Sequence, residues 1–157
     1  MSPRKKSENN APAQQMVDED LILLCELAQD IYRQLGSGHD ENIYQKAMEV
    51  GLRSKGIEYD AQRKIELTYL DHFVGIGIPD LIVRFKTKNV VVELKVGQAM
   101  GYGEEQQLRN YLKILRIPTG LLINFQCAGQ NLSFDKVELQ KRQVDHKEPQ
   151  QSPAVVS

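Results

Sequence analysis

The chain has 157 residues, of which 41% are hydrophobic and 26% are charged, and these values fit a single globular domain with tails. Its net charge is −1; because residues 1–16 carry +2 and residues 142–157 carry 0, the part between them carries −3. Proteins that hold nucleic acid mainly by electrostatics are basic, so this charge argues against tight nonspecific binding. It does not exclude a carboxylate cluster that attracts anions once a divalent metal ion fills it.

Both ends of the chain have the composition of tails. Residues 1–16 and 142–157 are rich in Gln, Pro, Ser and Asn, so we expect disordered tails on either side of one domain at residues 17–141. No apolar run approaches the roughly 18 residues that span a membrane, and residues 1–10 lack the apolar stretch of a signal peptide. We therefore expect an intracellular protein without membrane association, cytoplasmic, or nuclear if the source is eukaryotic. The two cysteines form no Cys-x-x-Cys pair, which argues against a thiolate zinc site.

The predicted elements begin with two helices. Apolar residues recur at three- and four-residue spacing from Asp18 to Leu35, and Gly36-Ser37-Gly38 ends this helix. A second helix runs from Asp40, its N-cap, to Gly56. The later elements are strands at 64–69, 74–85 and 90–96, a helix at 104–115, and strands at 120–125 and 132–139. The order ααβββαββ predicts an α/β fold with a central mixed β-sheet, since the helix at 104–115 makes its two flanking strands parallel.

Three ionisable residues interrupt the apolar strands. Asp80 precedes Leu81-Ile82-Val83, while Glu93 and Lys95 lie within the run Val90–Val96. A strand that is covered on both faces normally reads as continuous Val, Ile and Leu. Buried charges are costly unless they pair or bind a metal ion, so these residues predict a functional site.

Simple strand geometry brings the three residues together. Glu93 and Lys95 are two positions apart and share one face of their strand. If the hairpin is centred between Thr87 and Lys88, Asp80 lies opposite Lys95 and on the same face. An odd-length loop would break this parity.

Two carboxylates and a lysine suit phosphodiester hydrolysis. Mg²⁺ prefers carboxylate oxygens, so Asp80 and Glu93 are candidate ligands for one or two ions, with the carbonyl of Leu94 as a further candidate. Lys95 would orient the attacking water or stabilise negative charge in the transition state.

Three motifs in one order resemble the PD-(D/E)XK nuclease superfamily. Pro79-Asp80, followed after twelve residues by Glu93-Leu94-Lys95, is similar to the motif that names it. Residues 38–44 are similar to the Gly-x-x-Glu-x-x-Tyr signature of the GxxExxY family, and residues 107–111 resemble the Gln-x-x-x-Tyr motif of RecB-like exonucleases. The likeness spans residues 21–125 and implies a restriction-endonuclease-like core, in which helices flank the mixed sheet.

The resemblance also implies roles for single residues. The implied roles are metal binding by Asp80, Glu93 and Glu41, catalysis by Lys95, Gln107 and Glu41, and substrate contact by Tyr111, Tyr44 and His39. The implied cofactor is Mg²⁺ or Mn²⁺, and the implied partner is nucleic acid, with DNA favoured over RNA. Many relatives have a His before the Glu-x-Gln stretch where this chain has Glu104, which leaves the substrate preference open.

Two interpretations of the function remain. The first is a divalent-metal-dependent nuclease that uses metal-activated water; the alternative is a catalytically silent nuclease-fold module that binds or scaffolds protein partners. The acidic core favours the alternative, whereas five intact motif residues favour the enzyme. For the enzyme, a homodimer or a partner protein is expected, because a small catalytic domain with little positive surface needs help to hold its substrate. Purely structural roles are also open for some of these residues. Glu41 would stabilise the dipole of its helix from the first turn, and Tyr44 and Tyr111 would be core residues.

Overall fold

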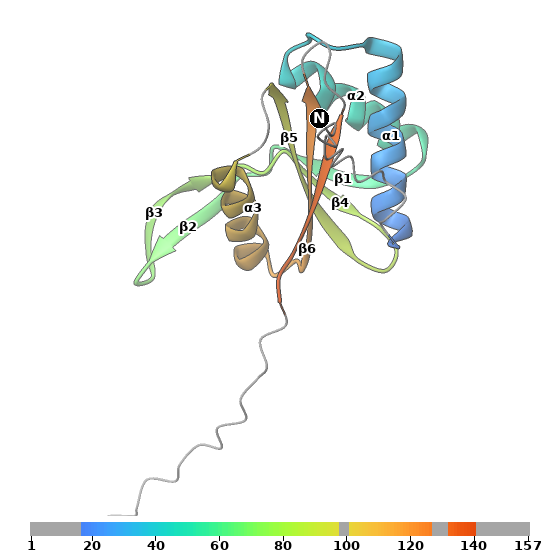
Figure 1. The fold of residues 1–157 in the computed structure, drawn as a ribbon. Coiled ribbons are helices and arrows are strands. Elements are labelled where there is room, and N and C mark those ends of the chain that lie inside the picture. Colours follow the sequence, from blue (N-terminus) through green and yellow to red (C-terminus); the bar gives the residue numbers. More distant parts are fainter. Residues whose placement is uncertain (1–16, 98–100, 127–131, 141–157) are drawn as a thin grey trace, which may run out of the picture.

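Three helices and seven strands make up the described part of the computed structural model, which covers residues 17–97, 101–126 and 132–140 (Figure 1). The helices are α1 (Glu19–Leu35), α2 (Glu41–Ser54) and α3 (Tyr102–Leu115). The strands are β1 (Glu58–Ala61), β2 (Ile65–Tyr69), β3 (His72–Gly77), β4 (Leu81–Arg84), β5 (Asn89–Gly97), β6 (Thr119–Gln126) and β7 (Ser133–Glu138). The predicted tails lie outside the described residues. No described helix is long and apolar enough to cross a membrane.

Five strands form the central sheet in the spatial order β1-β4-β5-β6-β7. β5 and β6 are parallel, while the other neighbouring pairs are antiparallel. α3 lies between β5 and β6 in the chain and provides the crossover that parallel strands require. The predicted α/β class, with a mixed sheet flanked by helices, is confirmed.

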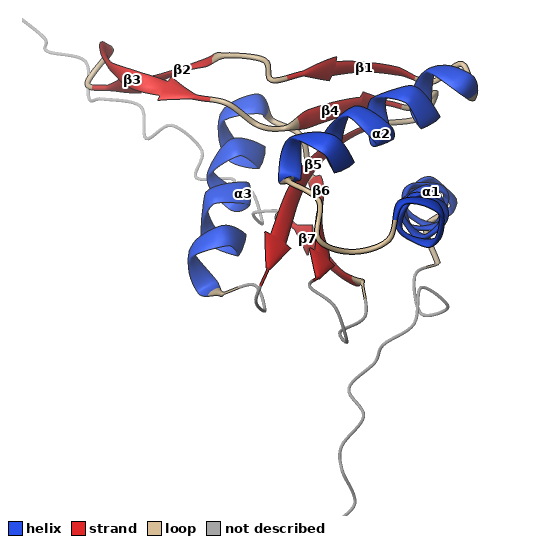
Figure 2. Ribbon diagram, turned by 90° about the horizontal axis from the view of Figure 1, so that it is seen from above, coloured by secondary structure: helices blue, strands red, loops and turns tan. Residues whose placement is uncertain are grey.

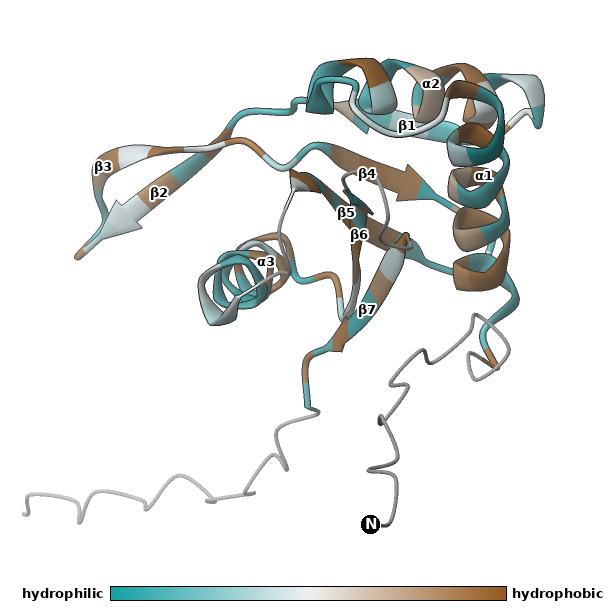
Figure 3. Cartoon of the chain, turned by 45° about the horizontal axis from the view of Figure 1, so that its top comes forward, coloured by the Kyte–Doolittle hydropathy of each residue, from teal (hydrophilic) through white to brown (hydrophobic). Residues whose placement is uncertain are grey.

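Helices cover both faces of the sheet (Figure 2). On β5, Val92 and Leu94 pack with the residues of α1 and α2, whereas Val91 packs with α3. Figure 3 shows the apolar colour along β4 and β6 that results from this two-sided burial. Because side chains alternate along a strand, Glu93 and Lys95 share the α3 face with Val91. The two charged residues of β5 therefore lie on one side of the sheet, as predicted.

The predicted strand at 74–85 is divided in the structure, and each half belongs to a different sheet. β3 pairs with β2 in a separate two-stranded ribbon that projects from the central sheet, whereas β4 pairs with β1 and β5 (Figure 2). The break falls at Ile78-Pro79-Asp80. Pro79 has no N–H to donate to a neighbouring strand, which favours an interruption there. The sequence did not predict β1, whose four residues are too few to show alternation.

The β4–β5 hairpin has the predicted parity, but its register is shifted by two residues. Its loop covers residues 85–88, and the backbone N–H of the first residue donates to the carbonyl of the last at 2.9 Å. Extending this register places Asp80 beside Glu93 rather than beside Lys95. Because the shift is even, Asp80 keeps the same face as both residues.

Candidate metal centre

Asp80 and Glu93 are held against each other by two hydrogen bonds that cross. The backbone N–H of Asp80 donates to Oε1 of Glu93 at 3.0 Å. One residue further along β5, the N–H of Leu94 donates to Oδ2 of Asp80 at 2.8 Å. Both carboxylates are buried, with relative exposures of 8% for Asp80 and 4% for Glu93. The start of β4 and the middle of β5 thus bring two carboxylates into one buried position.

Burial and the neighbouring carboxylates make it unfavourable for Glu93 to lose its proton. Burial, followed by the negative charges of Asp80 and Glu41, raises the pKa of Glu93 to about 8, although the hydrogen bond from Asp80 and the charge of Lys95 oppose the shift. Burial also raises the pKa of Glu41, with Lys95 lowering it and Asp80 raising it further. The predicted site residues Glu41, Asp80, Glu93 and Lys95 are therefore close enough for their charges to interact. A cation among them would relieve the repulsion between the carboxylates.

Two glutamines that the sequence did not indicate complete the surroundings of Asp80. Gln62 Nε2 donates to Oδ1 of Asp80 at 2.9 Å and to Oε1 of Gln45 at 2.8 Å. The backbone N–H of Gln62 donates to the carbonyl of Asp80 at 3.0 Å, and Gln45 Nε2 donates to the same carbonyl at 3.4 Å. Gln45 lies one helical turn after Glu41 on the buried side of α2, and an amide on that side was a signal that could have been read. Gln62 belongs to no sequence motif, and its contact with Asp80 forms only when the chain folds.

The donor set fits a hard divalent cation. Mg²⁺ is commonly held by one or two carboxylates together with water, and Asp80 and Glu93 provide two buried carboxylates. Within the described ranges, no three His, Cys, Asp or Glu side chains are close enough together to hold a metal ion. Asp80 and Glu93 are the two carboxylates in direct contact, Glu41 is linked to Asp80 through its raised pKa, and its role as a metal ligand stays a prediction.

Lys95 lies two residues beyond Glu93 on the same face of β5. Its parallel neighbour in β6 is Asn124, a fully buried residue. Lys95 itself is half-buried, and its charge reaches both Glu41 and Glu93, as their pKa shifts indicate. The structure thus brings together Glu41, Asp80, Glu93 and Lys95 from three separate elements.

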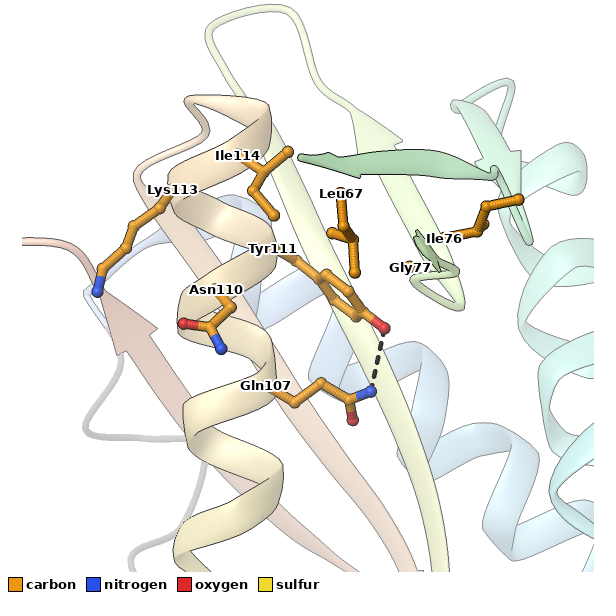
Figure 4. A pocket seen from close by; sticks show the side chains of 8 residues that line it. All are labelled: Leu67, Ile76, Gly77, Gln107, Asn110, Tyr111, Lys113 and Ile114. Carbon is orange, nitrogen blue, oxygen red and sulfur yellow. Dashed lines mark hydrogen bonds between the residues drawn. The ribbon is translucent and has the colours of Figure 1, made fainter. Parts of the chain in front are cut away.

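Gln107 and Tyr111 lie on α3, where they line a pocket of about 430 Å³ between this helix and the β2–β3 ribbon (Figure 4). Gln107 Nε2 donates to the hydroxyl of Tyr111 at 3.0 Å. Leu67, Ile76 and Gly77 form the ribbon side of the pocket. Tyr111 packs so closely that a Cβ added to Gly77 would lie 2.7 Å from its Cε1. Tyr111 therefore contacts the ribbon and Gln107 faces the same pocket, and their predicted roles with phosphate, water or substrate stay predictions.

Tyr44 and His39 stabilise the loop that connects α1 to α2. The ring of Tyr44 is fully buried and stacks on Phe125 with a centroid distance of 4.3 Å, and its hydroxyl donates to the carbonyl of Gly36 at 2.6 Å. Nε2 of His39 lies 2.8 Å from the carbonyl of Leu35 at the end of α1. For Tyr44, the predicted contact with substrate would require this connection to move. For His39, it would require the contact with α1 to break.

The fold and the buried acidic centre define an α/β protein with a site suited to a divalent metal ion. Residues 19–148 match the family model of the PD-(D/E)XK nuclease superfamily, and the chain belongs to this superfamily. Its nucleases generally use divalent metals.

Two solved structures are similar to this chain at low sequence identity, and the first of them shows the same fold. The crystal structure of SSO0001 is 14% identical, with a TM-score of 0.50, over 76% of this chain and 77% of that chain. The Holliday junction resolvase Hjc of Archaeoglobus fulgidus is 11% identical, with a TM-score of 0.40, over 60% of this chain and 84% of that chain. No curated protein matches the sequence significantly.

Proposed function

We propose that the chain is a nuclease that hydrolyses phosphodiester bonds of nucleic acid, DNA rather than RNA, with Mg²⁺ or Mn²⁺ as cofactor. We also propose that it falls in the GxxExxY, RecB-like branch of its superfamily and acts inside the cell. The observation that carries the proposal is the crossed pair of hydrogen bonds that joins Asp80 to Glu93 in a buried acidic position. Two like charges held together in a protein interior are costly, and metal binding offsets that cost.

The carboxylates form the metal-binding part of the proposed mechanism. Asp80 and Glu93, with Glu41 at the start of α2, would hold the cation, whose chemistry is to activate water and to offset the negative charge of the phosphate. The N–H of Leu94 and the amide of Gln62 each bind one oxygen of Asp80, so this carboxylate is oriented before any ligand arrives.

Lys95 and Gln107 are the remaining proposed participants. Lys95 lies on the Glu93 face of β5 and would place its positive charge where the attacked phosphate gains negative charge. Gln107 would position a phosphate or a water from α3, and the pocket that it lines lies between α3 and the ribbon leading to Asp80. Tyr111, beside Gln107, would then contact the substrate backbone.

A binding or scaffold module without cleavage is the second candidate. The net charge of −3 over residues 17–141 favours it, because unassisted contact with nucleic acid gains little from such a surface. The same charge supports the proposal that the chain works as a homodimer or with a partner protein.

Calorimetry with Mg²⁺ and Mn²⁺, run together with a cleavage panel, separates the two candidates. The panel holds single-stranded, duplex and branched DNA, and RNA of the same sequences. The test variant is Asp80→Asn/Glu93→Gln, which removes both negative charges and keeps the side-chain shapes. The nuclease proposal expects the variant to lose metal binding and metal-dependent cleavage together.

Glu49→Gln is the matched control. Glu49 is a buried carboxylate on α2, but its Oε2 lies 3.4 Å from Nζ of Lys46 and it has no contact with Asp80 among the described residues. The control should bind metal and cut as the wild type does. Metal binding without cleavage of any substrate would favour the module, and absence of metal binding in the wild type would contradict the proposed enzyme.

A further inference from the structure

The β2–β3 ribbon has two unlike faces. Ile65 and Leu67 of β2 pair with Gly77 and Gly75 of β3, and this face turns towards α3, where Gly77 meets Tyr111. Glycine opposite each large residue leaves room for the helix. This inner face is therefore occupied within the chain.

The outer face carries apolar residues that are at least half exposed in the described part of the chain. Glu66 and Thr68 are two apart on β2, so their partners Ile76 and Phe73 share one face, and the irregularity beside Leu67 accommodates the extra residue Val74. Phe73 is 61% exposed and Ile76 is 50% exposed. In Figures 2 and 3 the ribbon projects away from the central sheet.

The end of the ribbon extends this apolar surface. The full set, here called the ribbon patch, consists of Leu70, Phe73, Val74 and Ile76, each at least half exposed. Side chains of this size expose on the order of 500 Å² together, which lies within the range of the largest patch on a typical monomer. A stable dimer buries about 800 Å² on each partner. The patch therefore supplies somewhat more than half of that area, which is the apolar share of a typical interface, and the polar residues around it would supply the rest.

We propose that the ribbon patch is the contact surface of a homodimer, in which the outer face of one ribbon packs on the outer face of the other. A two-fold axis brings the same side chains together, so an apolar patch meets an apolar patch of equal size. The charged residues beside the patch on β2 and at its tip are Glu66 and Asp71, both acidic, which disfavours a phosphate backbone as the occupant. This inference does not depend on cleavage activity.

Sedimentation velocity on the full chain over a range of micromolar concentrations tests the proposal. The wild type should sediment as a dimer. Phe73→Glu/Ile76→Glu, which places two charges in the contact and beside Glu66, should sediment as a monomer with an unchanged circular dichroism spectrum. Val50→Glu is the matched control, because Val50 is 57% exposed on α2, away from the ribbon, and should leave the dimer intact.

Hydrogen exchange at low and high protein concentration gives a second measurement that needs no variant. Amides of residues 65–77 should become more protected as the dimer forms, while those of α2 should not. A monomeric wild type, a dimer that persists in the double variant, or a dimer that Val50→Glu also breaks would each overturn the proposal. A monomer whose ribbon amides are protected only by added nucleic acid would overturn it in favour of a substrate-binding ribbon.

Discussion

Gln62 donates a 2.9 Å hydrogen bond to Oδ1 of Asp80 from a backbone position with φ of 51°, in the left-handed region. Its own N–H also donates to the carbonyl of Asp80. The side chain of Gln62 is thus held in place by its backbone, and it holds the carboxylate in turn.

Gln62→Ala should weaken Mn²⁺ binding by roughly tenfold, because residues that hydrogen-bond to a metal ligand and orient it typically contribute 10- to 100-fold. Asp80 would keep its hydrogen bond from Leu94 but lose the one that fixes its other oxygen. Calorimetry compares this variant with Arg63→Ala, which changes an exposed neighbour of Gln62. Equal affinity in the two variants would show that Gln62 does not orient Asp80.

The metal-free protein should lose stability as pH rises. The pKa of Glu93 is raised in the folded protein to about 8 from an ordinary 4.5. A raised carboxyl pKa contributes stability that is complete below about pH 4.5 and is lost as pH rises through about 8. The loss should be on the order of a few kcal/mol across this window.

Denaturant unfolding of the wild type and Glu93→Gln at several pH values measures this loss. The difference between the two proteins isolates Glu93 from all other titrating groups, and it should change between pH 5 and 8. Added Mg²⁺ at pH 8 should recover stability in the wild type alone. A pH-independent difference would mean that Glu93 titrates normally in the folded chain.

Gly77→Ala should destabilise the protein by about 1–3 kcal/mol, as overpacking of a filled site does. Its new Cβ would lie 2.7 Å from Cε1 of Tyr111, and an aromatic ring has little freedom to retreat. Gly75→Ala is the control on the same strand and the same face, since a Cβ there meets nothing within 4 Å. Thermal unfolding compares the two, and equal stability would contradict the close packing of the ribbon on α3.

Tyr44→Phe should cost about 1 kcal/mol, the usual net value of a lost hydrogen bond, and should leave metal binding unchanged. The main lost bond is the one from its hydroxyl to the carbonyl of Gly36, and the long 3.4 Å bond that the hydroxyl accepts from the N–H of His39 is lost with it. Tyr69→Phe, at an exposed tyrosine, should change neither property. If Tyr44→Phe instead raises KM for a cleaved substrate without changing stability, Tyr44 contacts substrate as the sequence predicted.

The sequence correctly predicted that Asp80, Glu93 and Lys95 share one face of the sheet. It wrongly predicted that Asp80 lies opposite Lys95. Alternation along a strand depends only on spacing, so Glu93 and Lys95 had to share a face. Register depends on where the hairpin closes, and the apolar pattern around residues 85–88 does not mark that point. Asp80 consequently lies beside Glu93 instead of Lys95.

Other features were beyond the reach of sequence patterns. A continuous apolar pattern over residues 74–85 does not reveal that the chain leaves one sheet and enters another, although Pro79 was a local signal for the break. The contact of Gln62 with Asp80 joins residues 18 positions apart through the packing of the finished fold. Glu41 was found only through its motif, since a glutamate in the first turn of a helix is otherwise ordinary.

Gln62 and Asp80 also mark the two ends of the ribbon, since the chain enters it just after the first residue and leaves it just before the second. The hydrogen bonds between them close the base of residues 63–79. Changes at the tip of the ribbon, beyond the residues that meet α3, should therefore leave this base in place. The geometry of the acidic centre is set where the ribbon begins and ends, and it does not depend on the residues at the tip.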